Sequence, residues 1–199
     1  HQQNFGRSPR GMWIPECGYF PGLEDYLRSH HIEYFFTDAH GILFGEEKPH
    51  YGVYAPIQCK NGVSAFARDA SSSNAVWSND LGYPGDFEYR EFYRDIGFDL
   101  PMDYLEPYMF NRNTRMNTGF KYYAITGKTE DKIPYDPEAA RNKVEEHADN
   151  FLYRRNKQLY NINKYMDREP AIVTPFDAEL FGHWWFEGPL WLESLYRKM

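Results

Sequence analysis

Two carboxylate side chains follow short apolar runs and could work as a pair. Glu16 comes directly after the run 11–15, and Asp177 comes shortly after the run 171–174. Apolar runs of this length, bounded by Gly or Pro, predict buried β-strands. In a β/α barrel the carboxyl ends of the strands form the face that carries the active site. We therefore expect Glu16 and Asp177 to meet at this face, although they are distant in sequence.

A pair of carboxylates is what glycosidic bond cleavage requires. One carboxylate attacks or stabilises the oxocarbenium-like centre, and the other protonates the leaving oxygen. The sequence around both residues is crowded with aromatic side chains, which favours this chemistry: Trp13, Tyr19, Phe20, Phe176, Phe181, Trp184, Trp185 and Phe186. The alternative is that both are loop carboxylates that cap the helices after them. Glu179 and Glu187 also remain alternatives to Asp177, since Glu179 would share its face in an extended segment.

Aromatic residues are unusually frequent in this chain. They make up 19% of its 199 residues, which is more than a core of this size needs. We expect part of this excess to line a binding site. Sugar rings have apolar faces that stack on aromatic planes, while their hydroxyls bond to nearby polar groups. The composition therefore favours a carbohydrate ligand.

Charge and hydropathy exclude several classes of partner. Lys and Arg number 22 against 29 Asp and Glu, which leaves a net charge of -7 without a basic stripe. Such a surface repels a nucleic acid, so we expect no nucleic-acid partner. The mean hydropathy is -0.76 and no run of about 18 apolar residues occurs, so we expect no membrane partner and no cleavable signal segment. The oligomeric state is not encoded in these features.

Cysteine and histidine patterns give no indication of a metal or a cofactor. Cys17 and Cys59 are too few for a disulfide framework and form no C-x-x-C motif, and the seven histidines show no ligand spacing. We expect reduced thiols and a cytoplasmic location. No metal and no cofactor are implied.

The elements that must position the carboxylates alternate between strand and helix. Strands are predicted over five further stretches beside 11–15, namely 32–37, 51–57, 63–67, 119–125 and 171–174. A helix opens at Pro21 and Gly22, and the clearest helix starts at the cap Asp136 and should pack its apolar face on a sheet. A last helix is predicted from about Pro189. This order predicts an α/β architecture with parallel strands.

A long irregular, aromatic-rich insertion interrupts this alternation at about 68–118. It contains a short predicted helix near 88–95, and Trp77 is expected in one of its loops. Ordered excursions of this kind are more often functional than connecting. We expect Trp77, Tyr83 and Asp86 to contribute to the binding of a sugar chain.

Two long segments resemble the third and fourth signature regions of glycoside hydrolase family 57. They are 11–19, GMWIPECGY, and 176–188, FDAELFGHWWFEG. Their Glu-Cys-Gly-Tyr and Phe-Gly-His-Trp-Trp forms are most similar to the family's 1,4-α-glucan branching enzymes. The stretches 76–78 and 82–86 extend the resemblance over essentially the whole chain. The resemblance implies that residues 1–199 are the central part of a catalytic (β/α)7 barrel, an incomplete TIM-like barrel in this sequence, whose amino-terminal His-bearing regions and later helical domain lie outside it.

The resemblance also implies a retaining mechanism. Glu16 would be the nucleophile that forms a covalent glucosyl-enzyme, and Asp177 rather than Glu179 the acid/base. The acceptor would be a 6-hydroxyl of an α-glucan such as amylose, starch or glycogen. Two alternatives stay open: an α-amylase or 4-α-glucanotransferase of the same family, whose acceptor is water or a 4-hydroxyl, and a non-catalytic α-glucan-binding remnant. The presence of both Glu16 and Asp177 favours an enzyme.

Further substrate-binding residues are expected around this pair. Besides the three residues of the insertion, they are Asp38, His40, His183, Trp184 and Trp185. Asp38 and His40 end another predicted strand on the catalytic face, in a substrate or supporting role. His183 is expected to bond a glucose hydroxyl or orient Asp177, with a purely structural role as the alternative. Only one of Trp184 and Trp185 can face the site, and we expect the other in the core.

Overall fold

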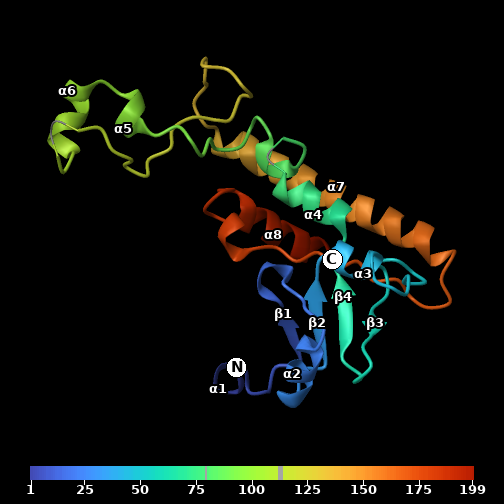
Figure 1. Ribbon diagram of the computed structural model, residues 1–199. Coiled ribbons are helices and arrows are strands. Elements are labelled where there is room, and N and C mark those ends of the chain that lie inside the picture. The colour runs from blue at the N-terminus through green and yellow to red at the C-terminus, as the bar shows by residue number, and fades with distance from the viewer. Residues whose placement is uncertain (79, 112–113) are drawn as a thin grey trace. The chain divides into compact units, whose positions relative to one another are not determined.

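The chain divides into two compact units (Figure 1). This computed structural model describes residues 1–78, 80–111 and 114–199. Unit 1 comprises residues 1–73 and 154–175, and unit 2 comprises residues 74–153 and 176–199. Of the predicted insertion at 68–118, residues 79 and 112–113 lie outside the described residues.

Unit 1 is built on a four-stranded sheet with the order β1-β2-β4-β3. Three of its strands are parallel: β1 (Gly11–Trp13), β2 (Tyr34–Thr37) and β4 (Ser64–Ala67). The short strand β3 (Ile57–Gln58) pairs antiparallel with β4 at the edge. The parallel sheet and the α/β content agree with the sequence prediction. The carboxyl ends of β1, β2 and β4 therefore lie along one edge.

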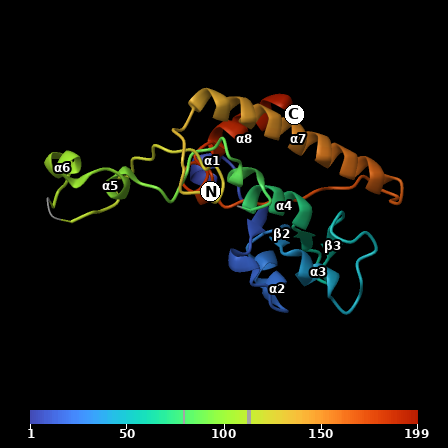
Figure 2. The same ribbon diagram turned by 90° about the horizontal axis from the view of Figure 1, so that it is seen from above.

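Alternating side chains of these strands pack beneath two helices. Phe35 of β2 and Ala65 of β4 are buried together with Leu27 of α2 (Leu23–Ser29) and Ile42 of α3 (Ala39–Leu43). Figure 2 shows α2 and α3 beside this sheet. A further short helix, α1 (Gln2–Phe5), has no buried residue. The apolar cluster fixes the strands from which the edge residues project.

Two of the predicted strands in this unit are wrong. Residues 51–55 form turns around Gly52, whose φ is 56°, so only Ile57 and Gln58 enter the sheet. Residues 171–174 form no strand; Ala171 N–H donates to Tyr54 O and Val173 O accepts from Asp69 N–H, at 2.9 and 2.8 Å. Pro170 and Pro175 flank this segment, and neither has the N–H that a longer ladder needs.

Unit 2 is organised by long helices and an aromatic cluster. Helix α7 (Pro137–Asn163) starts where predicted, because Asp136 Oδ1 accepts from the N–H groups of Glu138 and Ala139 at 2.8 and 3.2 Å. Helix α8 (Gly188–Lys198) also matches its prediction. Unit 2 takes in α7 up to Tyr153, and the rest of α7 belongs to unit 1.

The predicted packing of α7 on a sheet is wrong. Its buried residues in unit 2, among them Val144 and Phe151, pack on Trp191 of α8 and on Val76. Val76 and Trp77 lie on α4 (Ala70–Trp77), so the prediction that Trp77 sits in a loop is also wrong. The pattern of small and apolar residues at helical spacing does not distinguish a sheet from an aromatic cluster as the packing partner.

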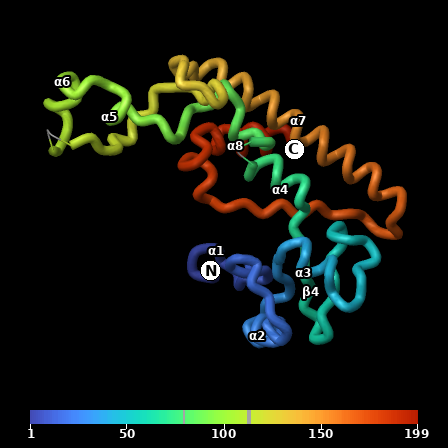
Figure 3. Tube along the Cα trace, turned by 45° about the horizontal axis from the view of Figure 1, so that its top comes forward, coloured from blue at the N-terminus to red at the C-terminus, as the bar shows by residue number. Residues whose placement is uncertain are grey.

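The remaining chain of unit 2 is mostly irregular. It holds the short helices α5 (Ile96–Asp99) and α6 (Met102–Leu105) and three 3₁₀ turns, η2 (Tyr83–Gly85), η3 (Glu106–Tyr108) and η4 (Ala178–Leu180). The helix predicted near 88–95 and the strand predicted over 119–125 are both wrong. Figure 3 shows the trace of this part of the chain. The two stretches instead pair antiparallel at the isolated bridge Arg90–Ala124, and Ile125 N–H donates to Tyr89 O at 2.8 Å.

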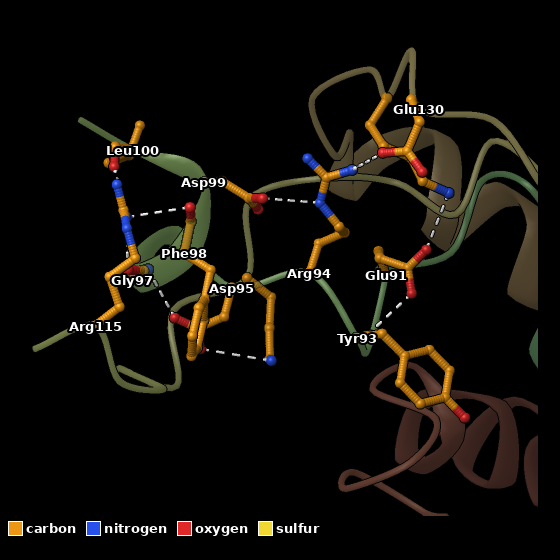
Figure 4. A network of polar contacts seen from close by, with 12 residues as sticks. Glu91, Tyr93, Arg94, Asp95, Gly97, Phe98, Asp99, Leu100, Arg115 and Glu130 are labelled. Atoms are coloured by element: carbon orange, nitrogen blue, oxygen red, sulfur yellow. Dashed lines mark hydrogen bonds and ion pairs between the residues drawn. The ribbon is translucent and has the colours of Figure 1, made fainter. Parts of the chain in front are cut away.

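Asp95 links the two ends of the chain segment that carries α5 and α6. Its carboxylate is 2% exposed and accepts a hydrogen bond from Gly97 N–H at 2.9 Å (Figure 4). It also accepts from the N–H and hydroxyl of Thr118 and from Gly119 N–H, all within 3.0 Å. Burial alone would raise its pKa, but these hydrogen bonds outweigh burial and lower the pKa to about 2. One buried carboxylate therefore ties both ends of the excursion together.

Candidate active site

Glu16 lies on a strained turn directly after β1. The 3₁₀ turn η1 (Pro15–Cys17) holds it at φ 54° and ψ 20°, and Cys17 has a φ of 54° as well. Left-handed backbone is uncommon for residues other than Gly, and strain of this kind gathers at functional sites. Hydrogen bonds from Cys17 N–H to Ile14 O and from Gly18 N–H to Pro15 O, at 2.9 and 3.1 Å, hold the turn. The Glu16 side chain is exposed.

A guanidinium group lies beside this turn. Arg68 follows β4 directly, and its guanidinium carbon lies 5.3 Å from the centre of the Trp13 ring. Its Nη2 donates to Cys17 Sγ at 3.9 Å, while its Nε is buried without a hydrogen-bond partner among the described residues. A cation is thus fixed next to the residue that follows Glu16.

Asp38 and His40 stand at the end of β2, on the same edge of the sheet. Asp38 Oδ1 accepts from Ala39 N–H at 2.6 Å and so caps α3. His40 Nδ1 lies 3.9 Å from this oxygen, and the His40 ring is exposed. The edge therefore brings Glu16, Asp38 and His40 to the carboxyl ends of parallel strands, as their positions in the sequence indicated.

Asp69 is a further residue of this edge that the sequence analysis missed. It is 3% exposed, and its carboxylate accepts from Ser72 N–H at 2.7 Å, Gln158 Nε2 at 2.8 Å and Arg155 Nη1 at 3.3 Å. Its own N–H donates to Val173 O. Asp69 thus holds the end of α7 and the segment that leads, in sequence, to Asp177. Its place directly after the predicted strand 63–67 was the available signal.

Asp177 opens the second signature segment, which belongs to unit 2. It is exposed and extended, at φ -74° and ψ 133°, and its carbonyl accepts from Leu180 N–H at 3.2 Å at the start of η4. Its carboxylate makes no capping hydrogen bond to that turn. The side chain is therefore not engaged by the turn that follows it.

Glu179 and Glu187, the two alternatives to Asp177, both form hydrogen bonds with other residues. Glu179 Oε1 accepts from Trp184 Nε1 at 3.1 Å and lies 3.9 Å from His183 Nε2. Glu187 is 1% exposed, and its Oε1 accepts from Arg90 N–H at 3.1 Å. Burial raises the pKa of Glu187, although the Tyr135 hydroxyl and Arg90 oppose this shift. Both rivals thus have structural partners within unit 2.

The tryptophan pair is split between surface and core. Trp185 is 1% exposed and packs with Trp191 in the aromatic cluster, whereas Trp184 is 47% exposed. Trp184 contacts the ring of Phe92 at a centroid distance of 4.6 Å, and His183 meets the edges of both rings. Trp184 and His183 are accordingly exposed, whereas Trp185 belongs to the core.

The residues of the insertion form a second group in unit 2. Trp77 is partly exposed at the end of α4. Tyr83 is buried, with its hydroxyl donating to Asn150 Oδ1 at 2.8 Å and its ring against His147. Asp86 Oδ2 lies 3.5 Å from His147 Nε2. The ring of Tyr83 is thus packed within unit 2, and its contribution to the binding of a sugar chain stays a prediction.

His147 is a titratable residue that sequence reasoning did not single out. Its Nδ1 is 2.8 Å from the Tyr89 hydroxyl, and burial lowers its pKa while the nearby Asp86 opposes that shift. Its position on the buried face of α7 gave no signal of a polar cluster. Within the described residues, no group of three or more His, Cys, Asp or Glu side chains is arranged to hold a metal ion.

Comparison with known proteins gives the family. The model of glycosyl hydrolase family 57 matches residues 1–106, which is more than half of the chain. The chain belongs to glycosyl hydrolase family 57. Members of this family and the present chain share the α/β fold with a sheet rich in parallel strands. Among the helices of the described part, none has both the length and the apolar character needed to cross a membrane.

Three similar proteins show how much of a family member the chain represents. A 1,4-alpha-glucan branching enzyme of Thermococcus kodakarensis is 32% identical over 231 residues, covering 100% of this chain and 31% of that protein. The crystal structure of the alpha-amylase AmyC from Thermotoga maritima is 50% identical with a TM-score of 0.88, over 99% of this chain and 39% of that chain. That of the branching enzyme from Pyrococcus horikoshii is 34% identical with a TM-score of 0.80, over 98% and 35%. The chain spans about a third of the length of the curated relatives it matches.

Proposed function

We propose that this chain carries the two catalytic carboxylates of a retaining enzyme that acts on α-glucans. Glu16 is the nucleophile and Asp177 the acid/base. The observation that carries the assignment is the exposed Glu16 on a left-handed turn at the carboxyl end of a parallel strand. A fold tolerates such strain where the position of the side chain matters more than backbone stability.

The reaction runs in two displacements. Asp177 donates a proton to the departing glycosidic oxygen while Glu16 attacks the anomeric carbon and forms a covalent glucosyl-enzyme. Asp177, now a carboxylate, then takes a proton from the incoming hydroxyl, whose oxygen displaces Glu16. The anomeric configuration is inverted twice and therefore retained.

The acceptor we propose is the 6-hydroxyl of an α-glucan chain, so that the enzyme makes α-1,6 branches in amylose-like substrates. The names of the similar proteins from Thermococcus kodakarensis and Pyrococcus horikoshii support this acceptor. A second candidate is hydrolysis by an α-amylase, in which water is the acceptor. The 50% identity to the alpha-amylase of Thermotoga maritima favours this candidate.

For the fold of the whole catalytic domain, we propose that residues 1–199 are part of a (β/α)7 barrel with an aromatic-rich insertion at about 68–118. The parallel neighbours β1, β2 and β4, each followed within three residues by a charged residue at one edge, support a barrel segment. We also propose a cytoplasmic enzyme, which is supported by the reduced state of Cys17 and Cys59, neither of which is in a disulfide among the described residues.

The product of amylose treatment distinguishes the two acceptors. With the full-length protein we expect new α-1,6 linkages in the proton NMR spectrum and little increase in reducing ends. Hydrolysis gives the opposite result, so many new reducing ends without α-1,6 linkages would assign an α-amylase.

Two variants test the catalytic roles. Glu16→Ala is expected to abolish turnover and to be partly rescued by azide, which attacks from the vacated face and gives a β-linked glucosyl azide. Asp177→Asn is expected to retain activity only on donors whose leaving group needs no proton. Glu179→Gln is the matched control, since Glu179 bonds to Trp184. If Glu179→Gln showed the Asp177 phenotype and Asp177→Asn did not, the acid/base assignment would be wrong.

A further inference from the structure

Unit 2 contains a cavity that the proposed catalytic roles do not use. Its volume is about 1030 Å³, at the upper end of the roughly 300–1,000 Å³ typical of small-molecule sites. The walls come from residues of the stretch 84–94, from the turn 125–132, from Asp80 and Asp99, and from Trp184 and Trp185. All of these residues belong to unit 2. The cavity therefore has room for more than one ring of an extended ligand.

One wall of the cavity is a fixed aromatic surface. The rings of Phe92 and Trp184 meet at 4.6 Å with an interplanar angle of 37°. Trp184 is also held by its hydrogen bond to Glu179, and Phe92 by Lys121, whose Nζ lies 5.5 Å from the ring centre. Because these contacts fix Trp184 while leaving it 47% exposed, it offers a pre-oriented apolar surface. A ligand with a flat apolar face fits such a wall.

The cavity is also lined by polar groups that form ion pairs. Arg94 Nε donates to Asp99 Oδ1 at 2.9 Å, and its Nη1 donates to Glu130 Oε2 at 3.3 Å (Figure 4). Lys132 Nζ lies 3.0 Å from Glu91 Oε2, and Glu91 Oε1 accepts from Tyr93 N–H. These pairs hold donors and acceptors in place before a ligand arrives.

Charge balance in the cavity favours a neutral ligand. Acidic and basic side chains occur in equal number among the lining residues, four of each. An anionic or cationic ligand would meet as much repulsion as attraction. Polyhydroxylated rings satisfy both walls, since their apolar faces stack on aromatic residues and their hydroxyls both donate and accept hydrogen bonds.

We infer that this cavity is a subsite for a stretch of glucan chain, with Trp184 and Phe92 contacting sugar faces and Arg94 and Glu91 contacting hydroxyls. The inference rests on the proposed function for its choice of sugar. It adds Phe92, Arg94 and Glu91 as residues that bind the chain.

Binding of maltoheptaose to the full-length protein tests this subsite. The measurement uses calorimetry in a Glu16→Gln background, so that the glucan is not consumed. Phe92→Ala is expected to weaken maltoheptaose binding about 3- to 10-fold, the loss of one aromatic contact. Phe110→Ala is the matched control, because Phe110 is 99% exposed and does not line this cavity. We expect it to bind as the parent does.

A second variant keeps the test valid if Phe92→Ala fails to fold. Arg94→Lys preserves the charge but lacks the planar guanidinium that donates from Nε to Asp99 and from Nη1 to Glu130, so affinity should again fall several-fold. Because the ligand is neutral, the affinity of the parent should change little with salt. Parent-like affinity in folded Phe92→Ala or Arg94→Lys protein overturns the subsite. Failure of the proposed function shows separately, as wild-type protein that turns over no α-glucan.

Discussion

Removing the carboxylate of Asp69 should destabilise unit 1 strongly. Asp69→Ala deletes the acceptor of three hydrogen bonds and leaves Arg155, whose side chain is 12% exposed, without this ion pair. At 3.3 Å and an effective dielectric constant of about 20, the direct attraction amounts to about 5 kcal/mol before desolvation. Breaking one side of a buried pair typically costs about 3–5 kcal/mol. We expect the free energy of unfolding to fall by that amount.

Asp69→Asn should be much milder, for a reason specific to this site. Asn keeps one oxygen for Ser72 N–H but presents its NH₂ group where Gln158 Nε2 now donates. Gln158 Oε1 is buried and has no partner among the described residues, so a rotated Gln158 amide can accept from that NH₂ group. Asn still offers Arg155 a hydrogen-bond acceptor but no charge, so we expect a loss of about 1–3 kcal/mol.

Urea unfolding of the full-length protein, followed by tryptophan fluorescence, measures both changes. Asp167→Ala is the control in the same unit, since its pair with Arg168 at 2.8 Å is largely exposed and should contribute less than about 1 kcal/mol. The reasoning is refuted if Asp69→Ala unfolds within about 1 kcal/mol of wild type. Equal losses for Asp69→Asn and Asp69→Ala would contradict the proposed amide rotation.

Three further predictions concern single sites. The pKa of Asp95 is about 2 in the folded protein against about 3.9 unfolded, so its stabilisation of roughly 2–3 kcal/mol is present above pH 4 and is lost as the pH falls toward 2. Proteolysis of the chain between Asp95 and Thr118, which its hydrogen bonds tie together, should accelerate over this range. The free energy of unfolding of Cys17→Val should be about 1–2 kcal/mol lower than that of Cys17→Gly, because only Gly adopts φ 54° freely. Similar values for the two variants in urea unfolding would exclude strain at this turn. Burial raises the pKa of Glu187, so its contribution to stability falls as the pH rises; Glu187→Gln should gain stability relative to wild type between pH 5 and pH 8 in thermal melts, and a constant difference would contradict this.

The sequence predicts the elements that local signals define. The cap Asp136 and the apolar face of α7 lie within one segment, so composition and spacing suffice to place that helix. The strands β2 and β4 are apolar along their length and were predicted for the same reason. Since parallel strands end at one edge, the neighbourhood of Glu16 and Asp38 also followed from the sequence.

Elements whose form depends on distant partners were not predictable in this way. The runs 119–125 and 171–174 have strand-like composition, but strands require a continuous neighbour and these runs make only isolated bonds. Asp69 and His147 gain their roles from residues far away in the chain, Gln158 and Asp86 among them. No spacing rule connects such pairs, so their polar clusters appear only in three dimensions.

The proposed catalytic roles and the proposed subsite both bear on which acceptor reacts with the glucosyl-enzyme. Water reaches that intermediate unless an acceptor hydroxyl is held close to it, and holding a chain in place can supply an effective molarity of about 10⁵ M or more. A contact in the subsite increases the fraction of enzyme that has a glucan chain bound, but it does not change the reactivity of Glu16. Loss of such a contact should therefore raise KM. We therefore expect Phe92→Ala to raise KM for amylose about 3- to 10-fold with nearly unchanged kcat, and high amylose to restore the rate. Glu16→Gln, which lacks the nucleophile, should stay inactive at every amylose concentration. A lower kcat at saturating amylose in Phe92→Ala would show instead that this wall orients the reacting groups.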